Sequence, residues 1–189
     1  MPRAKTAVKE AAILEAASRV FALRPFHEVL IDDIASNAGI GKGTIYRYFE
    51  TKDDLYFATS LYALEHLARA IEKARAPEDA ALVQLERVAR EILSFFWDRR
   101  HLLTMLSSYE RTDREAEVLK RRDSILKVVQ EAILAGIERR ELRGVNPRLG
   151  AELFLGMTRS ANLFRHPEDT LDELVAHIMS VYSEGMARR

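Results

Sequence analysis

A short segment rich in hydrogen-bond donors is the part of the chain whose residue types most clearly suggest a chemistry. Three of the eight glycines, Gly39, Gly41 and Gly43, fall within five residues. Five residues of this segment would share the outward face of one helix: Lys42, Gly43, Thr44, Arg47 and Tyr48. Their side chains and backbone supply donors that can reach base edges and phosphates in the major groove of DNA.

The residues around this segment have the spacing of two helices joined by a tight turn. Ala35 is small enough for a close helix crossing, and Gly39 can adopt the left-handed backbone that the turn needs. Ile45 is placed to wedge the two helices together. The second helix is expected to begin near Gly41 and to continue through Phe49. Spacing alone leaves a generic helical hairpin open as an alternative.

The elements that position this unit are predicted to be helices throughout. Apolar residues recur with helical spacing in the ranges 13–21, 57–71, 82–96, 124–140 and 171–182. No run alternates strictly over six residues, so no sheet is expected. The predicted fold is all-α, with three short helices in residues 1–52 and longer helices in residues 53–189. Thr51 is expected to cap the helix that begins at this boundary.

Composition narrows the function classes. The 29 basic and 29 acidic residues cancel, so any attraction to nucleic acid must come from a local patch. Residues 36–52 hold three bases against Glu50. The absence of cysteine excludes a disulfide scaffold, thiol catalysis and any Cys-ligated metal. No segment has the roughly 18 apolar residues of a membrane span, and no signal peptide is recognised, so a soluble cytoplasmic protein without a membrane partner is expected.

An enzyme is the main rival from another class, and the sequence gives it little support. No two of the five histidines are four residues apart, so no metal site is expected. Residues 39–44 contain glycines and Lys42, but they lack the spacing of a phosphate-binding loop, and no strand precedes them. We therefore expect neither catalytic residues nor a cofactor.

The segment and its surroundings carry a family resemblance. The runs that carry it are DIA at residues 33–35, AGIGKGTIYRYF at residues 38–49 and KDDL at residues 52–55. Together they closely resemble the N-terminal DNA-binding domain of the tetracycline-repressor (TetR) family. The resemblance covers about residues 9–57, and the rest of the chain agrees in helical character and length.

The resemblance implies roles for individual residues. Lys42, Thr44 and Arg47 are expected to face the groove, beside the backbone of Gly43. Tyr46 and Tyr48 are expected to contact phosphate, with Tyr46 also packing partly against the domain. Lys52 corresponds to the family's phosphate-binding lysine. The expected partner is a double-stranded DNA operator, bound by a homodimer because one unit makes too few contacts.

The sequence departs from the family pattern at Pro25, Gly41 and three further positions that bear on phosphate contacts. Hydroxyl residues are common where this chain has Val29 and Leu30, so a phosphate contact there would need bare backbone N–H groups. Asp32 stands where the family often has a cation or polar reader, and phosphate should repel it. These departures put the operator contacts in question more than the fold.

The dimer surface is expected on the last two helices, 147–164 and 167–185, which would form a four-helix bundle with those of a second subunit, as in the family. The expected interface residues are Leu149, Leu153, Gly156, Met157, Ser160, Leu171, Leu174, Ile178, Val181 and Tyr182. The alternative is that these apolar stripes are buried within one subunit.

The centre of the second domain is rich in aromatic residues and methionine. These residues could simply form the hydrophobic core. The family resemblance instead implies that they line an apolar pocket for a small effector. The candidate pocket residues are Phe96, Met105, Tyr109, Arg159, Asn162 and Phe164. For Arg159, a surface ion pair is the competing interpretation.

These expectations combine into a functional hypothesis. The chain is expected to be a ligand-responsive transcriptional regulator, a repressor that binds a palindromic operator as a dimer and is released by a small molecule. The helix that begins near Thr51 would connect the two domains and transmit the change. The alternative is a helical ligand-binding or adaptor module that does not bind DNA. Salt-dependent DNA binding would separate the two.

Overall fold

Helices account for all the regular elements that we observe in this computed structural model, which describes residues 2–109 and 112–186 without the side chains of residues 2–6, 105 and 186. The elements are α1 (Pro2–Leu23), a 3-10 turn η1 (Phe26–Glu28), α2 (Ile31–Ala38), α3 (Lys42–Ile45), α4 (Lys52–Lys73), α5 (Ala81–Trp97), α6 (Arg100–Ser108), α7 (Glu115–Glu138), α8 (Pro147–Phe164) and α9 (Leu171–Met186). The described residues form no β-strand, and the predicted all-α class is confirmed.

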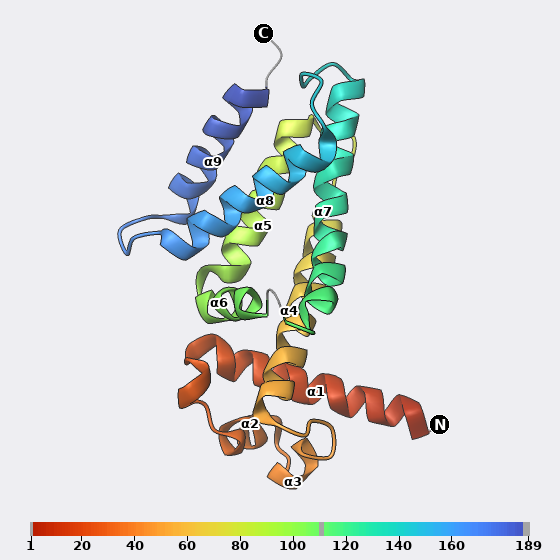
Figure 1. The fold of residues 1–189 in the computed structure, drawn as a ribbon, viewed down its shortest axis with the longest axis vertical. Helices are drawn as coiled ribbons and strands as arrows, with labels where there is room; N and C mark the ends of the chain where they lie inside the picture. Colours follow the sequence, from red (N-terminus) through yellow and green to blue (C-terminus); the bar gives the residue numbers. More distant parts are fainter. Residues whose placement is uncertain (1, 110–111, 187–189) are drawn as a thin grey trace.

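The first three helices form a small bundle at one end of the molecule (Figure 1). Helix α1 packs against both α2 and α4, and α2 packs against α3. Phe21, Ile34 and Ile45 are almost completely buried at the centre of this bundle. The ring of Tyr56 in α4 lies 4.4 Å from that of Phe21, centre to centre, so the start of α4 completes the core.

Helix α4 connects this bundle to the rest of the molecule. The Thr51 hydroxyl accepts a hydrogen bond from the Asp54 N–H at 3.0 Å, which satisfies one free donor of the first turn, as the sequence predicts. Further along, α4 packs against α5, α6 and α7. The expected domain boundary between residues 52 and 53 lies in the first turn of this shared helix, and a division there stays a prediction.

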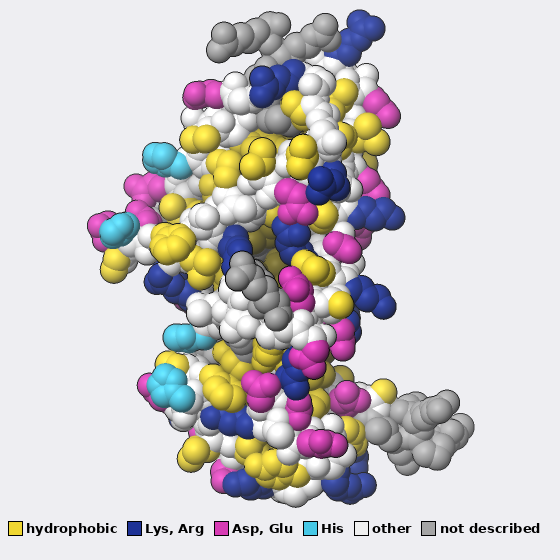
Figure 2. Space-filling model, in the orientation of Figure 1, with side chains coloured by type: hydrophobic (Ala, Val, Ile, Leu, Met, Phe, Trp, Pro, Cys, Tyr) yellow, Lys and Arg dark blue, Asp and Glu magenta, His cyan; other side chains and the backbone are white. Residues whose placement is uncertain are grey.

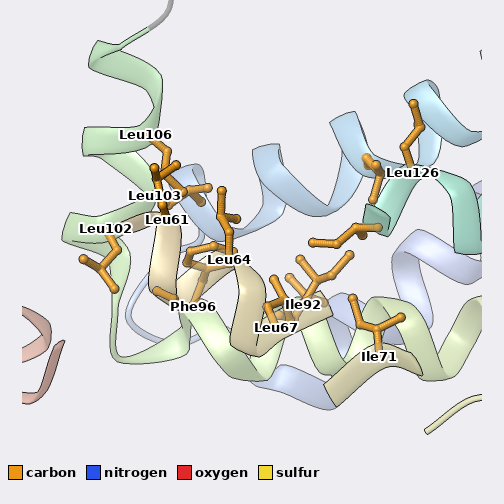
Figure 3. Packing of buried hydrophobic residues seen from close by; sticks show 14 of the residues in the cluster. Leu61, Leu64, Leu67, Ile71, Ile92, Phe96, Leu102, Leu103, Leu106 and Leu126 are labelled. Atoms are coloured by element: carbon orange, nitrogen blue, oxygen red, sulfur yellow. The ribbon is translucent and has the colours of Figure 1, made fainter. Parts of the chain in front are cut away.

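Helices α4 to α9 form the larger body. Helix α5 runs through it and contacts α7, α8 and α9, while α8 and α9 lie at the outside (Figure 1). Leucine and isoleucine side chains from α4, α5, α6 and α7 converge between these helices (Figure 3). None of the described helices combines the length and the apolar character needed to cross a membrane.

Three helix boundaries differ from the sequence expectation. Helix α3 ends at Ile45 instead of continuing to Phe49, because the following N–H groups form tighter bonds, such as Arg47 to the Thr44 carbonyl at 3.3 Å. Helix α7 begins at residue 115, earlier than the expected 124. Helix α9 begins at residue 171, not 167, because Thr170 and Glu173 cap it reciprocally.

Candidate nucleic-acid interface and central cavity

The turn between α2 and α3 has the geometry that the sequence predicts. Gly39 ends α2 with a φ of 65°, in the left-handed region where a side chain would be strained. Its N–H bonds to the Ser36 carbonyl at 3.2 Å, and the next N–H, that of Ile40, bonds to the Ala35 carbonyl at 3.0 Å. These bonds satisfy the end of α2 and set the direction in which α3 leaves.

Burial of two apolar residues orients the segment that begins with α3. Ile45 and Phe49 are buried in the domain core, which turns the intervening residues outward. Among the seven predicted contact residues, Lys42, Gly43, Tyr46 and Arg47 are exposed, whereas Thr44, Tyr48 and Lys52 are half-buried. Helix α3 lies at the free end of the molecule in Figure 1, so this surface is open to a large partner. DNA contact by these residues stays a prediction.

Two of the candidate cations have specific neighbours. The Lys42 ammonium donates to Asp32 of α2 at 2.9 Å, and this carboxylate raises the pKa of the lysine. The Lys52 ammonium lies 4.3 Å from the ring centre of Phe26, and desolvation lowers its pKa. Lys52 is therefore held over an aromatic ring at the start of α4.

The start of α2 has a side-chain cap that was not among the sequence-based expectations. The Asp33 carboxylate accepts a hydrogen bond from the Leu30 N–H at 3.1 Å and another from Arg24 at 2.8 Å. The Leu30 N–H is the largest cause of the lowered pKa of Asp33. This donor is therefore not one of the bare N–H groups expected for phosphate. The signal was present in the spacing of Asp33, three residues after Leu30.

A cavity of about 400 Å³ lies in the larger body. Its lining comes from five helices, and most of it is apolar: Leu64, Leu67, Ile92, Phe96, Leu103, Leu106, Val118, Leu119, Ile125 and Leu155. Figure 3 shows Leu64, Phe96 and Leu103 near one another from three helices. In Figure 2 a hollow with hydrophobic atoms at its floor opens near the middle of the molecule, between cationic side chains. This size is typical of small-molecule sites.

A few polar groups interrupt the apolar wall. Arg122 of α7 forms an ion pair with Glu152 of α8, and this bond lowers the pKa of Glu152. Arg159 donates to the Ser107 hydroxyl at 2.6 Å, joining α8 to α6. Asn162 is buried in α8, and its Oδ1 atom has no hydrogen-bond partner in the described structure. The cavity thus combines an apolar interior with two guanidinium groups.

Only some of the six predicted pocket residues line the cavity. Phe96, Arg159 and Asn162 line the cavity. Tyr109 does not: its ring packs 4.7 Å from that of Phe57, and its hydroxyl lies 3.4 Å from Asp53. Phe164 points to solvent with 75% of its surface exposed, because it lies at the end of the outer face of α8. The side chain of Met105 lies outside the described residues.

The ten predicted interface residues differ in their exposure to solvent. An outer stripe of α8 is exposed and consists of Leu149, Leu153, Gly156 and Ser160, with Val181 exposed on α9. Met157, Leu171 and Leu174 are half-buried. Ile178 and Tyr182 are buried within the subunit, and the Tyr182 hydroxyl donates to the Gly150 carbonyl at 3.0 Å. Helix α9, which carries these two residues, packs against α5 and α8, and the dimer interface itself stays a prediction.

A contact between α7 and α4 lies between the two candidate sites, and the sequence did not indicate it. Arg114, which precedes α7, pairs with Asp53 at 2.9 Å and with Asp54 in the first turn of α4. Its guanidinium also lies 4.7 Å from the ring centre of Phe57. The next residue, Glu115, lines the cavity. The wall of the cavity is therefore one residue from a group that holds the start of α4.

Comparison with known proteins gives matches at the level of family and fold. Residues 13–59 match the family model described as bacterial regulatory proteins, tetR family. A fatty acid metabolism regulator protein of Bacillus subtilis is 29% identical over 156 residues, which cover 76% of each chain.

Solved structures share the fold over almost the whole chain. The transcriptional regulator FadR from Bacillus subtilis, in complex with stearoyl-CoA, superimposes with a TM-score of 0.73 at 21% identity, covering 92% of this chain and 97% of FadR. The regulator AibR, in complex with isovaleryl coenzyme A and operator DNA, gives a TM-score of 0.66 at 19% identity, with 92% and 97% covered. At these identities the likeness shows the fold.

Proposed function

Because the chain belongs to the tetR family of bacterial regulatory proteins, which are DNA-binding transcriptional regulators, we propose that it is a homodimeric repressor whose effector is an acyl-CoA thioester. The observation that carries the proposal is the pairing of an outward-facing α3 segment with a mostly apolar cavity in the adjoining body. The first supplies donors for an operator, and the second suits an acyl chain.

The DNA-binding part of the proposal assigns Lys42, Thr44 and Arg47 to base edges, with Gly43 allowing close approach of the backbone. Tyr46, Tyr48 and Lys52 would contact phosphates. Two such units about 34–36 Å apart read two half-sites on one face of DNA, so a twofold dimer implies a palindromic operator. Operator occupancy would repress transcription.

The dimer surface that we propose is the exposed stripe of α8, defined as Leu149, Leu153, Gly156, Ser160 and Phe164, with Val181 of α9 beside it. The α8 members recur at intervals of three or four residues, so they share one helix face. Leu153 and Phe164 are 68% and 75% exposed, and burying them against a second copy is favourable by about 25 cal/mol per Å². Figure 2 shows hydrophobic side chains gathered over α8.

The effector part rests on the cavity and on two relatives. FadR is solved with stearoyl-CoA and AibR with isovaleryl coenzyme A. The apolar wall would receive the acyl chain, while Arg122 and Arg159 would lie nearest to the polar part. Because Arg122 is already paired with Glu152, it offers less attraction to a free carboxylate than an unpaired arginine would. The choice of a thioester over a free fatty acid therefore rests on these two relatives.

The first experiment tests DNA reading. The purified protein selects sequences from a random duplex pool, and binding to the enriched duplex is then followed against salt. We expect a palindrome and a log affinity that falls steeply with log salt. Arg47→Ala should lose this selectivity, whereas Arg143→Ala, an exposed arginine between α7 and α8, should retain it. No enrichment by a folded dimer would instead favour a module that does not bind DNA.

The second experiment tests the effector. The operator complex is titrated with stearoyl-CoA, isovaleryl-CoA, free stearate and coenzyme A alone, and the released DNA is measured. We expect release by at least one thioester and none by coenzyme A. Leu119→Trp, which enlarges a cavity residue of α7, should weaken release. Leu134→Trp, on the same helix and similarly exposed, is the matched control. If no thioester released the DNA, the proposed effector class would be contradicted.

The third experiment tests the interface. Leu153→Glu places a charge at the centre of the proposed α8 stripe, so it should convert the dimer to a monomer in sedimentation at micromolar concentration. Leu134→Glu, at another exposed leucine outside the stripe, should leave the dimer intact. A dimer that persists in Leu153→Glu would place the interface elsewhere.

A further inference from the structure

An exposed ion pair joins the two helices of the candidate DNA-reading unit. Asp32 is the second residue of α2, and Lys42 is the first residue of α3. The Lys42 Nζ atom lies 2.9 Å from Asp32 Oδ2. The side chains are 48% and 62% exposed, respectively, so the pair stands on the surface that faces a DNA partner under the proposed function.

Fold stability does not account well for this pair. Exposed ion pairs contribute about 0–1 kcal/mol, because water screens the charges and two side chains lose freedom. The pair also reduces attraction to phosphate, since the Asp32 charge cancels that of Lys42. A non-specific phosphate contact would be stronger without the carboxylate. The arrangement is therefore better suited to reading bases than to holding the backbone.

The free hydrogen-bonding groups of the pair match one base pair. The Lys42 ammonium has three donors, of which Asp32 uses one, and the carboxylate retains acceptor capacity. In the major groove guanine presents the acceptors O6 and N7, and cytosine presents the N4 donor. O6 and N4 are joined by a Watson–Crick hydrogen bond, so they lie about 2.9 Å apart. The protein donor and acceptor have the same separation.

From this match, and resting on the proposed function, we propose that Asp32 and Lys42 read one G·C base pair of each half-site as a unit. Lys42 donates to guanine O6 or N7, and Asp32 accepts from cytosine N4. Asp32 is thus a specificity-determining residue at a position where phosphate repulsion alone predicted a loss of affinity. It rejects a thymine at the cytosine position, whose O4 would face the carboxylate as a second acceptor.

The test compares sequence preferences, which a purely repulsive role would not change. Duplex selection is run with the wild type, Asp32→Ala, Lys42→Ala and, as a control on a neighbouring exposed carboxylate, Glu28→Ala. The wild type and Glu28→Ala should require a G·C pair at one symmetric position. Asp32→Ala should lose the preference at that position while retaining the rest of the operator, and its affinity for random duplex should rise because a negative charge is removed.

An atomic substitution in the operator sharpens the test. The cytosine of that pair is replaced by 2-pyrimidinone, which lacks the 4-amino group. The wild type should lose about 10-fold in affinity, and Asp32→Ala should be nearly insensitive. An unchanged preference in Asp32→Ala, with equal gains on all duplexes, would overturn the inference and leave the proposed function standing. A wild type that enriches no sequence would overturn both.

Discussion

At the residue scale, the burial of neighbouring apolar residues determines which side chains of the α3 region are exposed. Ile45 and Phe49 are buried, and this leaves Lys42 and Arg47 on the outside. The same argument separates Tyr109 from the effector cavity. Its hydroxyl is beside Asp53, and burial first of all, with that carboxylate next, raises its pKa to about 12. The type of a residue therefore predicted its position correctly only where the burial of its neighbours turned its side chain in the expected direction.

Lys52 carries the prediction that belongs to this scale. Its ammonium is held over Phe26 at the start of α4, in position for a phosphate rather than a base. Lys52→Ala should weaken binding to all duplexes alike and reduce the salt slope by about one unit, because one phosphate contact is lost. Lys73→Ala, at the far end of the same helix, is the control. A changed sequence preference in Lys52→Ala would contradict the phosphate role.

At the element scale, helix ends and close crossings set the positions of the longer helices. The first turn of α4 is held by three side chains. Thr51 accepts a hydrogen bond from the Asp54 N–H, the Asp54 carboxylate complements the positive end of the helix dipole, and Arg114 pairs with that carboxylate. The start of α5 is fixed differently. Ala81 donates its N–H to Glu141 at 2.6 Å, so the segment that follows α7 holds the beginning of α5.

Gly136 provides a test of that crossing. A Cβ atom at this position in α7 would lie 2.5 Å from the Ala81 Cβ atom and 2.9 Å from Leu142. Gly136→Ala should therefore destabilise the protein by about 1–3 kcal/mol, despite the higher helix propensity of alanine. Urea unfolding at fixed protein concentration measures the change. Gly185→Ala in α9, where a Cβ meets nothing within 4 Å, should not destabilise. Equal stability of the two variants would refute the close contact.

The cap of α4 predicts a pH dependence. Hydrogen bonding from Thr51, and then the bond and charge of Arg114, hold the pKa of Asp54 below its usual 3.8. A carboxylate with a lower pKa in the folded state stabilises the fold above the unfolded-state pKa, and loses this effect as the pH falls through the folded-state pKa. Asp54→Ala should cost about 1 kcal/mol at pH 7.

That cost should begin to decrease as the pH falls below about 3.8, the unfolded-state pKa, and it should be lost once the pH passes below the lower folded-state pKa. Thermal unfolding of both proteins between pH 7 and pH 3 measures it, with Glu50→Ala as an exposed neighbouring control. A cost that stays constant over this range would show that Asp54 does not act through its charge.

At the scale of the whole molecule, the cavity and the DNA-reading end are joined by a short physical route. Helix α7 contributes Glu115, Val118 and Leu119 to the cavity wall. Arg114, immediately before them, holds the first turn of α4. Helix α1 adds a second contact, because it packs against α6 as well as α2. A ligand that moves the start of α7 would therefore act on both α4 and the small bundle.

Arg114→Gln tests this route. The variant should retain operator and effector binding but reduce the effect of the effector on operator affinity, which for allosteric proteins is about 5- to 150-fold. Operator affinity is measured with and without saturating effector, in this variant and in Arg143→Gln as the control. The same ratio in Arg114→Gln and wild type would show that coupling does not depend on this contact.

Local sequence patterns were enough to predict the parts of this protein whose structure depends on residues close together in the sequence. Ala35, Gly39 and Ile45 predicted the α2–turn–α3 unit, because small, left-handed and apolar positions within a dozen residues specify such a turn. Helical periodicity predicted the all-α class for the same reason. The sequence pattern predicted an α3 that is too long, because tighter hydrogen bonds, such as that from the Arg47 N–H to the Thr44 carbonyl, follow Ile45.

The direction in which each helix face points was decided only by the tertiary structure. Phe164, Tyr109 and Tyr182 all fit apolar stripes, yet one faces solvent, one packs on α4 and one is buried under α8. The cavity was likewise decided by the tertiary structure, because its wall comes from five helices. A sequence determines which residues share a face of one helix, since that depends on a fixed 3.6-residue period. What that face meets depends on packing between segments tens of residues apart, and no local period encodes it.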